Sequence, residues 1–217
     1  MARVRTAVLI SGRGSNLQAL LDAAADASFP AEIVCVISNR PGAGGLARAE
    51  AAGVAALTLD HKAYNAREAF EDALHAALTD QGAELVCLAG FMRLLTPGFV
   101  QRWQGRMINI HPSLLPSFKG VDTHQRALDA GVKLTGASVH FVSAEMDAGP
   151  VIGQGAVPVL PGDDAAALAA RVLTVEHKLY PECLRQVASG QARLVDGRVV
   201  IARGAPASAM LLNPPPI

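Results

Sequence analysis

Short apolar runs alternate with alanine-rich segments over the first half of the chain. The apolar runs contain many β-branched residues and lack the strict apolar–polar alternation of a strand with one solvated face, so they are typical of strands buried on both faces. This alternation predicts a parallel sheet with helices on both sides. The expected strands are 4–10, 32–38, 55–59, 84–90 and 106–111, and the expected helices are 16–27, 44–53 and 67–78.

The second half of the chain has a different order of elements. A helix is expected near 123–131, and two further strands are expected at 134–143 and 150–160. Residues 161–189 are expected to form a long helix whose first turn carries acids, as the positive end of a helix dipole prefers. Its apolar stripe contains Leu168, Val172, Val175 and Leu179, and Pro181 should kink it.

Residues 192–202 are expected to form a β-hairpin with Asp196-Gly197 as its turn. The tail 204–217 has no periodicity and should be extended or mobile. The fold class is therefore α/β: a Rossmann-like, open, mostly parallel sheet with helices on both faces, followed by a long C-terminal helix and a β-hairpin. With 217 residues, one domain over 1–203 is expected.

Composition excludes several classes of partner. The formal net charge is zero, which argues against a nucleic-acid-binding or anionic membrane-binding surface. The first apolar run is too short for a signal peptide, and no run approaches the ~20 apolar residues of a membrane span. Cys35, Cys87 and Cys183 lack metal or redox spacing, so we expect reduced core thiols in a cytoplasmic protein.

A glycine loop follows the first strand. Gly12, Gly14, Ser15 and Asn16 lie between that strand and the first helix, where a tight turn and free helix amides suit a phosphate. Alternatively, Ser15 or Asn16 only caps the helix, which is compatible with phosphate binding. An NAD site is disfavoured, because Leu17 replaces the third glycine of the fingerprint and the second strand closes without an acid.

Two polar residues close the fifth expected strand. Asn109 and His111 are two positions apart and therefore share a face. An amide can donate to a developing oxyanion and an imidazole can exchange a proton near neutral pH, which together suit acyl transfer. Alternatively, both residues serve the core, with Asn109 satisfying loop backbone and His111 hydrogen-bonded inside it.

Other reaction types are disfavoured by what the chain lacks. No G-x-S-x-G nucleophile is present, so direct transfer is preferred to an acyl-enzyme. His111, His124 and His140 lack the spacing of a metal hydrolase, so no metal is expected. Asp147, in the sequence "EMDAGPVI", could be the carboxylate that stabilises a charged imidazole or an ordinary turn residue; spacing does not decide between them.

Five motifs in one order resemble the phosphoribosylglycinamide formyltransferase family of folate-dependent enzymes in purine biosynthesis. They are "SGRGSNLQALL", "GFMRLL", "NIHPSLLPSFKG", "GASVHFVSAEMDAGPVIGQ" and "RVLTVEHKLYP", and they span Val4 to Tyr180. The resemblance implies transfer of a formyl group from 10-formyltetrahydrofolate to the amine of glycinamide ribonucleotide (GAR). It implies Asn109, His111 and Asp147 as the catalytic residues.

The resemblance also implies the two substrate sites. GAR would contact Gly12, Gly14, Ser15, Asn16, Leu17 and Glu176, although Glu176 taken alone would be a solvated helix glutamate. Residues 1–105 would then hold the nucleotide phosphate, and residues 106–203 would carry catalysis and folate binding. The folate contacts would be Arg67, Met92, Arg93, Leu94, Leu95, Asn109, Ser143, Ala144, Glu145, Met146 and Asp147.

Taken alone, Met92 to Leu95 would be a loop with core anchors and Arg67 a surface helix arginine. The contributions of Lys119 and Asp122, in the loop after the "LLP" motif, are left open. The expected partners are the two small molecules, with no nucleic acid and no membrane, and the protein would be a monomer or homodimer.

Three alternatives accompany this interpretation. A methionyl-tRNA formyltransferase would need a C-terminal nucleic-acid-binding domain, and a formyltetrahydrofolate hydrolase would need an N-terminal regulatory domain; the length of the chain favours neither. A non-catalytic nucleotide- or folate-binding module would keep the fold and lose the chemistry, although all three implied catalytic residues are present.

Overall fold

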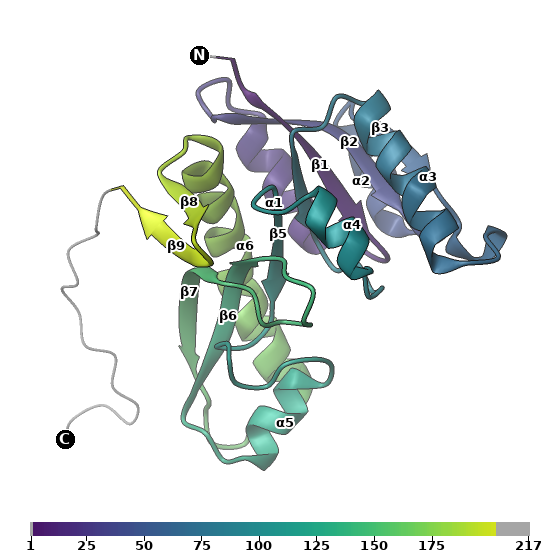
Figure 1. Cartoon of the computed structure of the whole chain (residues 1–217). Coiled ribbons are helices and arrows are strands. Elements are labelled where there is room, and N and C mark those ends of the chain that lie inside the picture. Colours follow the sequence, from purple (N-terminus) through teal and green to yellow (C-terminus); the bar gives the residue numbers. More distant parts are fainter. Residues whose placement is uncertain (1, 203–217) are drawn as a thin grey trace.

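A seven-stranded sheet forms the centre of the molecule (Figure 1). The computed structural model describes residues 2–202, so the expectation for the tail 204–217 lies outside the described residues. The strand order is β3-β2-β1-β4-β5-β6-β7, in which β1 to β5 are parallel and β6 is antiparallel to both neighbours. This confirms the predicted mostly parallel sheet. The strands are β1 (Val4–Ile10), β2 (Ala31–Ser38), β3 (Ala55–Thr58), β4 (Leu85–Leu88), β5 (Met107–His111), β6 (Leu134–Phe141) and β7 (Val151–Pro158).

Two hydrophobic layers cover the faces of the sheet. One layer contains buried side chains of α1, α2, α5 and α6, and the other contains those of α3 and α4. All four residues of β4 are buried, as expected for a central strand covered on both faces. The helices are α1 (Ser15–Ala24), α2 (Gly44–Ala51), α3 (Arg67–Asp80), α4 (Pro97–Arg102), α5 (Thr123–Asp129) and α6 (Ala165–Ala188).

The long C-terminal helix α6 packs on β6 and β7. Its predicted stripe is confirmed, because Leu168 and Val172 are fully buried and Val175 and Leu179 pack against the same core. The helix begins after Asp164, whose carboxylate accepts a hydrogen bond from the amide of Ala167 at 2.7 Å. Pro181 lies inside the helix, which continues to Ala188; the expected kink stays a prediction.

Strands β8 (Ala192–Val195) and β9 (Arg198–Ile201) form the predicted hairpin. Asp196 and Gly197 both have positive φ, as a two-residue turn of this hand requires. The short helix α4 and the 3-10 turn η1 (His61–Ala63) were not predicted. Thr96 caps α4 and proline follows it at the first helical position, which is a recognisable start signal.

The start of α1 corrects one expectation. Gly14, with φ of 74°, is the N-cap residue, and no side chain makes a cap hydrogen bond there. The alternative that Ser15 or Asn16 only caps the helix is therefore wrong. A Cβ on Gly14 would lie 2.7 Å from the Cα of Gly45, so the turn also needs glycine for close packing against α2.

The order of the strands predicts where a ligand would bind. The chain builds β1, β2 and β3 in one direction across the sheet and then returns to add β4 beside β1. Open α/β sheets bind ligands at such a switch point, outside the carboxyl ends of the strands. The loops after β1 and β4 flank this point, and the end of β5 lies next to them.

The three cysteines are free and buried, as predicted. Burial raises the pKa of Cys35 to about 11 and the pKa of Cys87 and Cys183 to about 12, so these thiols are poor nucleophiles. Within residues 2–202, no helix has the length and apolarity needed to cross a membrane.

Candidate functional site

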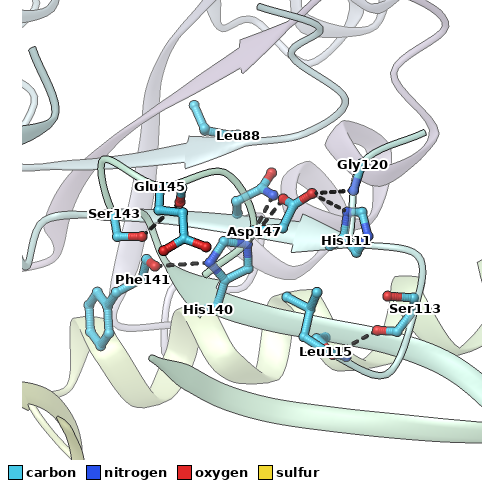
Figure 2. A network of polar contacts seen from close by, with 12 residues as sticks. Leu88, His111, Ser113, Leu115, Gly120, His140, Phe141, Ser143, Glu145 and Asp147 are labelled. Carbon is cyan, nitrogen blue, oxygen red and sulfur yellow. Dashed lines mark hydrogen bonds and ion pairs between the residues drawn. The ribbon is translucent and has the colours of Figure 1, made fainter. Parts of the chain in front are cut away.

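Three side chains converge where β5 ends. Asn109 and His111 come from β5, and Asp147 comes from the loop between β6 and β7. The Asp147 carboxylate lies 3.3 Å from Nδ1 of His111 and accepts a hydrogen bond from the amide of Gly120 at 2.9 Å (Figure 2). Asp147 has φ of 50°, an uncommon conformation that brings its side chain to the histidine. The structure therefore brings the two predicted partners together.

The ring of His111 faces an oxygen acceptor on each side. Nε2 lies 3.0 Å from the carbonyl oxygen of Phe118, and Nδ1 faces the carboxylate of Asp147. A carbonyl oxygen accepts only, so Nε2 carries a hydrogen. A doubly protonated ring would satisfy both acceptors, with the carboxylate as counter-ion. The side chain is 7% exposed, which limits competition from water.

Asn109 contacts a second histidine rather than loop backbone. Its amide nitrogen lies 3.2 Å from Nε2 of His140, which stands directly opposite it on β6. Nδ1 of His140 donates to the carbonyl oxygen of Phe141 at 2.9 Å (Figure 2), so in the neutral ring Nε2 accepts from the amide. The interaction orients the amide and leaves its other hydrogen uncommitted among the described residues. The alternative that Asn109 satisfies loop backbone is therefore wrong.

Burial keeps His140 in the neutral form. Its side chain is 3% exposed, and desolvation lowers its pKa despite its bond to Phe141 and the nearby carboxylate of Asp147; the charge of His111 lowers it further. A neutral ring is the form that can accept from Asn109. In the sequence His140 is a candidate only for a metal ligand, and this contact is not visible there, because the pairing of β5 with β6 depends on long-range register.

A buried serine secures the loop that follows His111. The hydroxyl of Ser138, on β6, donates to the carbonyl oxygen of Ser113 and accepts from the amide of Leu115 at 2.7 and 2.9 Å. Gln154 donates to the carbonyl oxygen of Leu115 at 2.9 Å. These bonds fix the loop 113–118, whose last residue supplies the carbonyl oxygen that holds His111.

The residues after the "LLP" motif brace the site. Lys119 forms an ion pair of 3.0 Å with Glu145, which lies two residues before Asp147. Asp122 has φ of 56° and begins α5 without a side-chain cap. Lys119 therefore connects the loop that follows β5 to the loop that carries Asp147.

The glycine loop has the geometry that favours an anion. Its turn is braced by α2, because the amide of Gly45 donates to the carbonyl oxygen of Gly12 at 3.0 Å. The first amides of α1, at Ser15, Asn16 and Leu17, have no acceptor within the helix. Such amides and the helix dipole favour a phosphate.

Glu176 lies beside this loop and is buried. The side chain of Asn16 donates to its carboxylate at 2.6 Å, and Glu176 is 6% exposed. Desolvation raises the pKa of Glu176, which Asn16, His177 and His111 partly offset. The alternative of a solvated helix glutamate is wrong, since the residue joins α6 to the phosphate loop. The Oδ1 atom of Asn16 is buried without a partner within the described chain.

Three exposed apolar side chains lie on loops next to the candidate catalytic residues, two after β4 and one directly before Asp147. Met92 and Leu94 are 62% and 57% exposed, and Met146 is 49% exposed. Arg93 lies over the ring of Phe70, at 5.4 Å from its centroid, and Leu95 packs against the core. Large exposed apolar side chains near polar groups are typical of a ligand site.

The other predicted folate contacts are less closely placed. Ser143 donates its hydroxyl to the carbonyl oxygen of Glu145 at 2.9 Å, which shapes the loop before Asp147 (Figure 2). Ala144 and Glu145 are exposed. Arg67 is the exposed first residue of α3 and contacts none of the three candidate catalytic residues. In the range 2–202, no three His, Cys, Asp or Glu side chains gather to form a metal site.

Comparison with known proteins connects this geometry to a family. A family described as "Formyl transferase" matches residues 4–184. The Escherichia coli phosphoribosylglycinamide formyltransferase is 46% identical over 86% of this chain and 88% of its own length. The bovine trifunctional purine biosynthetic protein adenosine-3 is 52% identical over 91% of this chain, which spans only 20% of that longer protein.

Solved structures agree with the sequence comparison. Glycinamide ribonucleotide transformylase 1 from Symbiobacterium toebii superposes with a TM-score of 0.89 at 48% identity, covering 92% of this chain and 94% of its own. The phosphoribosylglycinamide formyltransferase from Brucella melitensis gives a TM-score of 0.83 at 54% identity, covering 87% and 97%. The resemblance found in the sequence is thus confirmed, and the chain belongs to the formyl transferase family, with the phosphoribosylglycinamide formyltransferases among its relatives.

Proposed function

We propose that the protein transfers the formyl group of 10-formyltetrahydrofolate to the amine of GAR, giving formyl-GAR and tetrahydrofolate. The observation that supports this most strongly is the arrangement of Asn109, His111 and Asp147 at the carboxyl end of β5, together with the free helix amides after β1 and the exposed apolar side chains on neighbouring loops. A formyl transfer between a phosphorylated amine and a folate needs those three features together.

The catalytic step assigns a role to each of these residues. The GAR amine attacks the formyl carbon, forming a carbon–nitrogen bond and placing negative charge on the formyl oxygen. The uncommitted hydrogen of the Asn109 amide would donate to that oxygen, and the positive charge of protonated His111 would stabilise it. The bond from carbon to N10 of the folate then breaks; the amine loses a proton and N10 gains one.

Proton transfer would involve the looser contact of His111. The distance of 3.3 Å between Nδ1 and the Asp147 carboxylate exceeds the 2.7 to 2.9 Å of a short charge-assisted hydrogen bond. The bond from Nε2 to Phe118 is shorter, at 3.0 Å, and belongs to a loop fixed by Ser138. Breaking the contact between Nδ1 and Asp147 would therefore let the ring exchange a proton at Nδ1. The nearby carboxylate of Asp147 would still balance the charge of the imidazolium.

The two substrates would occupy opposite sides of the catalytic residues. The GAR phosphate would bind the amides of Ser15, Asn16 and Leu17 in the turn formed by Gly12 and Gly14. Glu176, held by Asn16 beside this loop, would accept hydrogen bonds from polar groups of the nucleotide. Residues 1–105 would hold the phosphate, and residues 106–203 would carry catalysis and most of the folate site.

The folate would lie along residues 92–95 and the loop 143–147. Within the described chain, the backbone groups of Arg93, Leu94 and Leu95 have no hydrogen-bond partner. Free amides and carbonyls flanked by exposed Met92 and Leu94 fit a flat pterin with polar edges. Arg67 would meet the acidic tail. We keep a cytoplasmic location and a monomeric or dimeric state as predictions.

An absorbance assay for tetrahydrofolate tests this function. Purified protein, 10-formyltetrahydrofolate and GAR should give product, whereas controls without GAR, or with methionyl-tRNA in its place, should not. Product without any acceptor would instead identify a hydrolase, and dependence on the tRNA would identify a tRNA formyltransferase. Folate binding without product would indicate a non-catalytic module.

A further inference from the structure

The segment 91–96, between β4 and α4, belongs to no helix or strand and bends at Arg93. Phe91 and Leu95 pack against the core and Arg93 stacks on Phe70, while Met92 and Leu94 face solvent. Without ladder hydrogen bonds, something else must hold the shape of such a segment. Side chains from three distant parts of the chain do so.

The first end of the segment is tied to the ends of β1 and β2. The hydroxyl of Ser11 accepts from the amide of Met92 at 2.8 Å and donates to the side-chain oxygen of Asn39. The amide of Ser11 also donates to the carbonyl oxygen of Gly90 at 3.1 Å. Ser11 and Asn39 are 6% and 1% exposed. The donor and the acceptor of each hydrogen bond in this series are therefore defined.

The second end is tied to α3. One oxygen of the Glu71 carboxylate accepts from the amide of Thr96 at 2.7 Å, and the other accepts from the Thr96 hydroxyl. That hydroxyl in turn caps α4 by accepting from the amide of Phe99 at 3.3 Å. Glu71 is 3% exposed, although its two neighbours on the helix surface, Asp72 and Glu68, are exposed. A buried carboxylate is costly unless its oxygens are hydrogen-bonded, as they are here.

The hydrogen bonds at Met92 and at Thr96 fix the backbone on either side of residues 93–95, whose own amides and carbonyls have no partner in the described chain. We propose that Ser11, Asn39 and Glu71 are positioning residues that hold the segment 91–96 in the shape that accepts the folate. This inference rests on the proposed function. The residues act through backbone amides, so they set folate affinity and leave the chemistry at Asn109 unchanged.

Ser11 allows the two substrate sites to be told apart, because it directly precedes Gly12 of the glycine loop. A residue that served only that loop would change GAR binding when replaced. A residue that positions the segment 91–96 changes folate binding instead. The two substrates therefore separate the two roles.

Steady-state kinetics of Ser11→Ala and Glu71→Ala test the proposal. Each variant should raise the KM for 10-formyltetrahydrofolate by about fivefold or more, the effect of losing a hydrogen bond that preorganises a site. The KM for GAR and the kcat at saturating folate should stay within about twofold of the wild type, because the groups that contact GAR and the formyl carbon are untouched. Glu71→Gln keeps an oxygen for the Thr96 amide and should restore most of the folate affinity.

Two matched variants control for general damage. Thr6→Val removes a buried hydroxyl from the opposite end of β1, where it donates to the carbonyl oxygen of Val4. Asp72→Ala removes the carboxylate next to Glu71, which pairs with Arg102 at the surface. Both should leave the KM for folate unchanged, whatever they do to the melting temperature.

Direct measurements separate this proposal from the proposed function. Amide hydrogen exchange over residues 91–96 should be faster in Ser11→Ala and Glu71→Ala than in the wild type and the controls, and calorimetry should show weaker binding of tetrahydrofolate. Wild-type protein that forms product, with unchanged folate KM in both variants, would overturn the positioning role alone. Wild-type protein that neither turns over nor binds tetrahydrofolate would overturn the proposed function, and the positioning role with it. Should Glu71→Ala fail to fold, Ser11→Ala decides the result.

Discussion

Asn109 is the residue whose replacement should lower turnover most. Its amide is oriented by His140, and Asn109 shares a face of β5 with His111. Removing one oxyanion donor typically costs about 10² to 10³ in kcat. We expect this loss for Asn109→Ala in the GAR-dependent assay, with a circular-dichroism spectrum like that of the wild type. Near-normal kcat in the folded variant would remove Asn109 from the mechanism.

His140 should affect turnover through the orientation of Asn109. Replacing it with leucine removes the acceptor for the amide, and we expect kcat to fall by about fivefold to tenfold, the effect of one hydrogen bond. His140→Gln can present an oxygen at the same place and should retain more activity than His140→Leu. Equal activity in the two variants would show that the contact at 3.2 Å does not orient the amide.

Replacing Glu176 should weaken substrate binding without lowering stability. Its burial raises its pKa, which means that the ionised form is held at a cost at neutral pH. Glu176→Gln removes that cost and keeps an oxygen for Asn16, so urea denaturation at pH 7 should show no loss of stability. The KM for GAR should rise by about tenfold, because GAR would then donate to a neutral amide oxygen instead of a charged carboxylate. A loss of stability with unchanged KM would make Glu176 purely structural.

The predictable part of the site is local in sequence. Asn109 and His111 share a face because strands alternate, and the glycine loop follows the first strand; both features are visible without a structure. The proximity of Asp147 to His111 needed the resemblance, since spacing alone left it open. His140 and Ser11 were missed, because their roles arise from strand register and from a contact 81 residues away along the chain.

At the scale of elements, the contact between α6 and β7 has no room for an additional atom. A Cβ on Gly155 would lie 2.2 Å from Cγ1 of Val175, so the valine side chain or the helix would have to shift. We expect Gly155→Ala to lower the free energy of unfolding by about 1 to 3 kcal/mol, as overpacking does. Urea denaturation measures this change.

Gly98→Ala is the matched control for Gly155→Ala. Gly98 lies in α4 with a normal helical φ, and a Cβ there would meet only Thr96, at 3.9 Å. Alanine is a better helix former than glycine, so this variant should gain about 0.5 to 1 kcal/mol. Similar changes in the two variants would mean that the packing of α6 on β7 is not limiting.

Elements with strong periodicity were predicted, and short ones were not. The stripe of α6 repeats over several turns and identifies both the helix and its buried face. Helix α4 has six residues, too few for a periodic signal, and only its Thr-Pro start marks it. The segment before it, 91–96, owes its shape to Ser11 and Glu71, which no local pattern indicates.

For the whole molecule, two desolvated histidines, the buried His140 and the partly buried His124, should make stability depend on pH. Desolvation lowers the pKa of His140 and of His124 below the ordinary value of 6.5, which an unfolded chain would show. As pH falls through 6.5, the unfolded chain therefore binds protons before the native state does, and stability falls. The raised pKa of Glu176 has the opposite effect on stability. As pH falls from the raised pKa to the ordinary value of 4.5, the native state binds this proton before the unfolded chain does, so stability rises.

The contribution of His140 can be isolated from these opposing effects by comparing curves. His140 faces Asn109, the carboxylate of Asp147 at 3.9 Å, the carbonyl oxygen of Phe141 and the charge of His111. Glutamine in its place does not titrate, so the free energy of unfolding of His140→Gln, measured in urea at pH 5, 6, 7 and 8, should fall less steeply toward pH 5 than that of the wild type. Above pH 7 the two curves should run parallel, because the wild-type ring is then neutral in both states. Parallel curves down to pH 5 would mean that His140 takes up its proton as easily in the folded protein as in the unfolded chain. His140 would then not be held in the neutral form that accepts a hydrogen bond from Asn109.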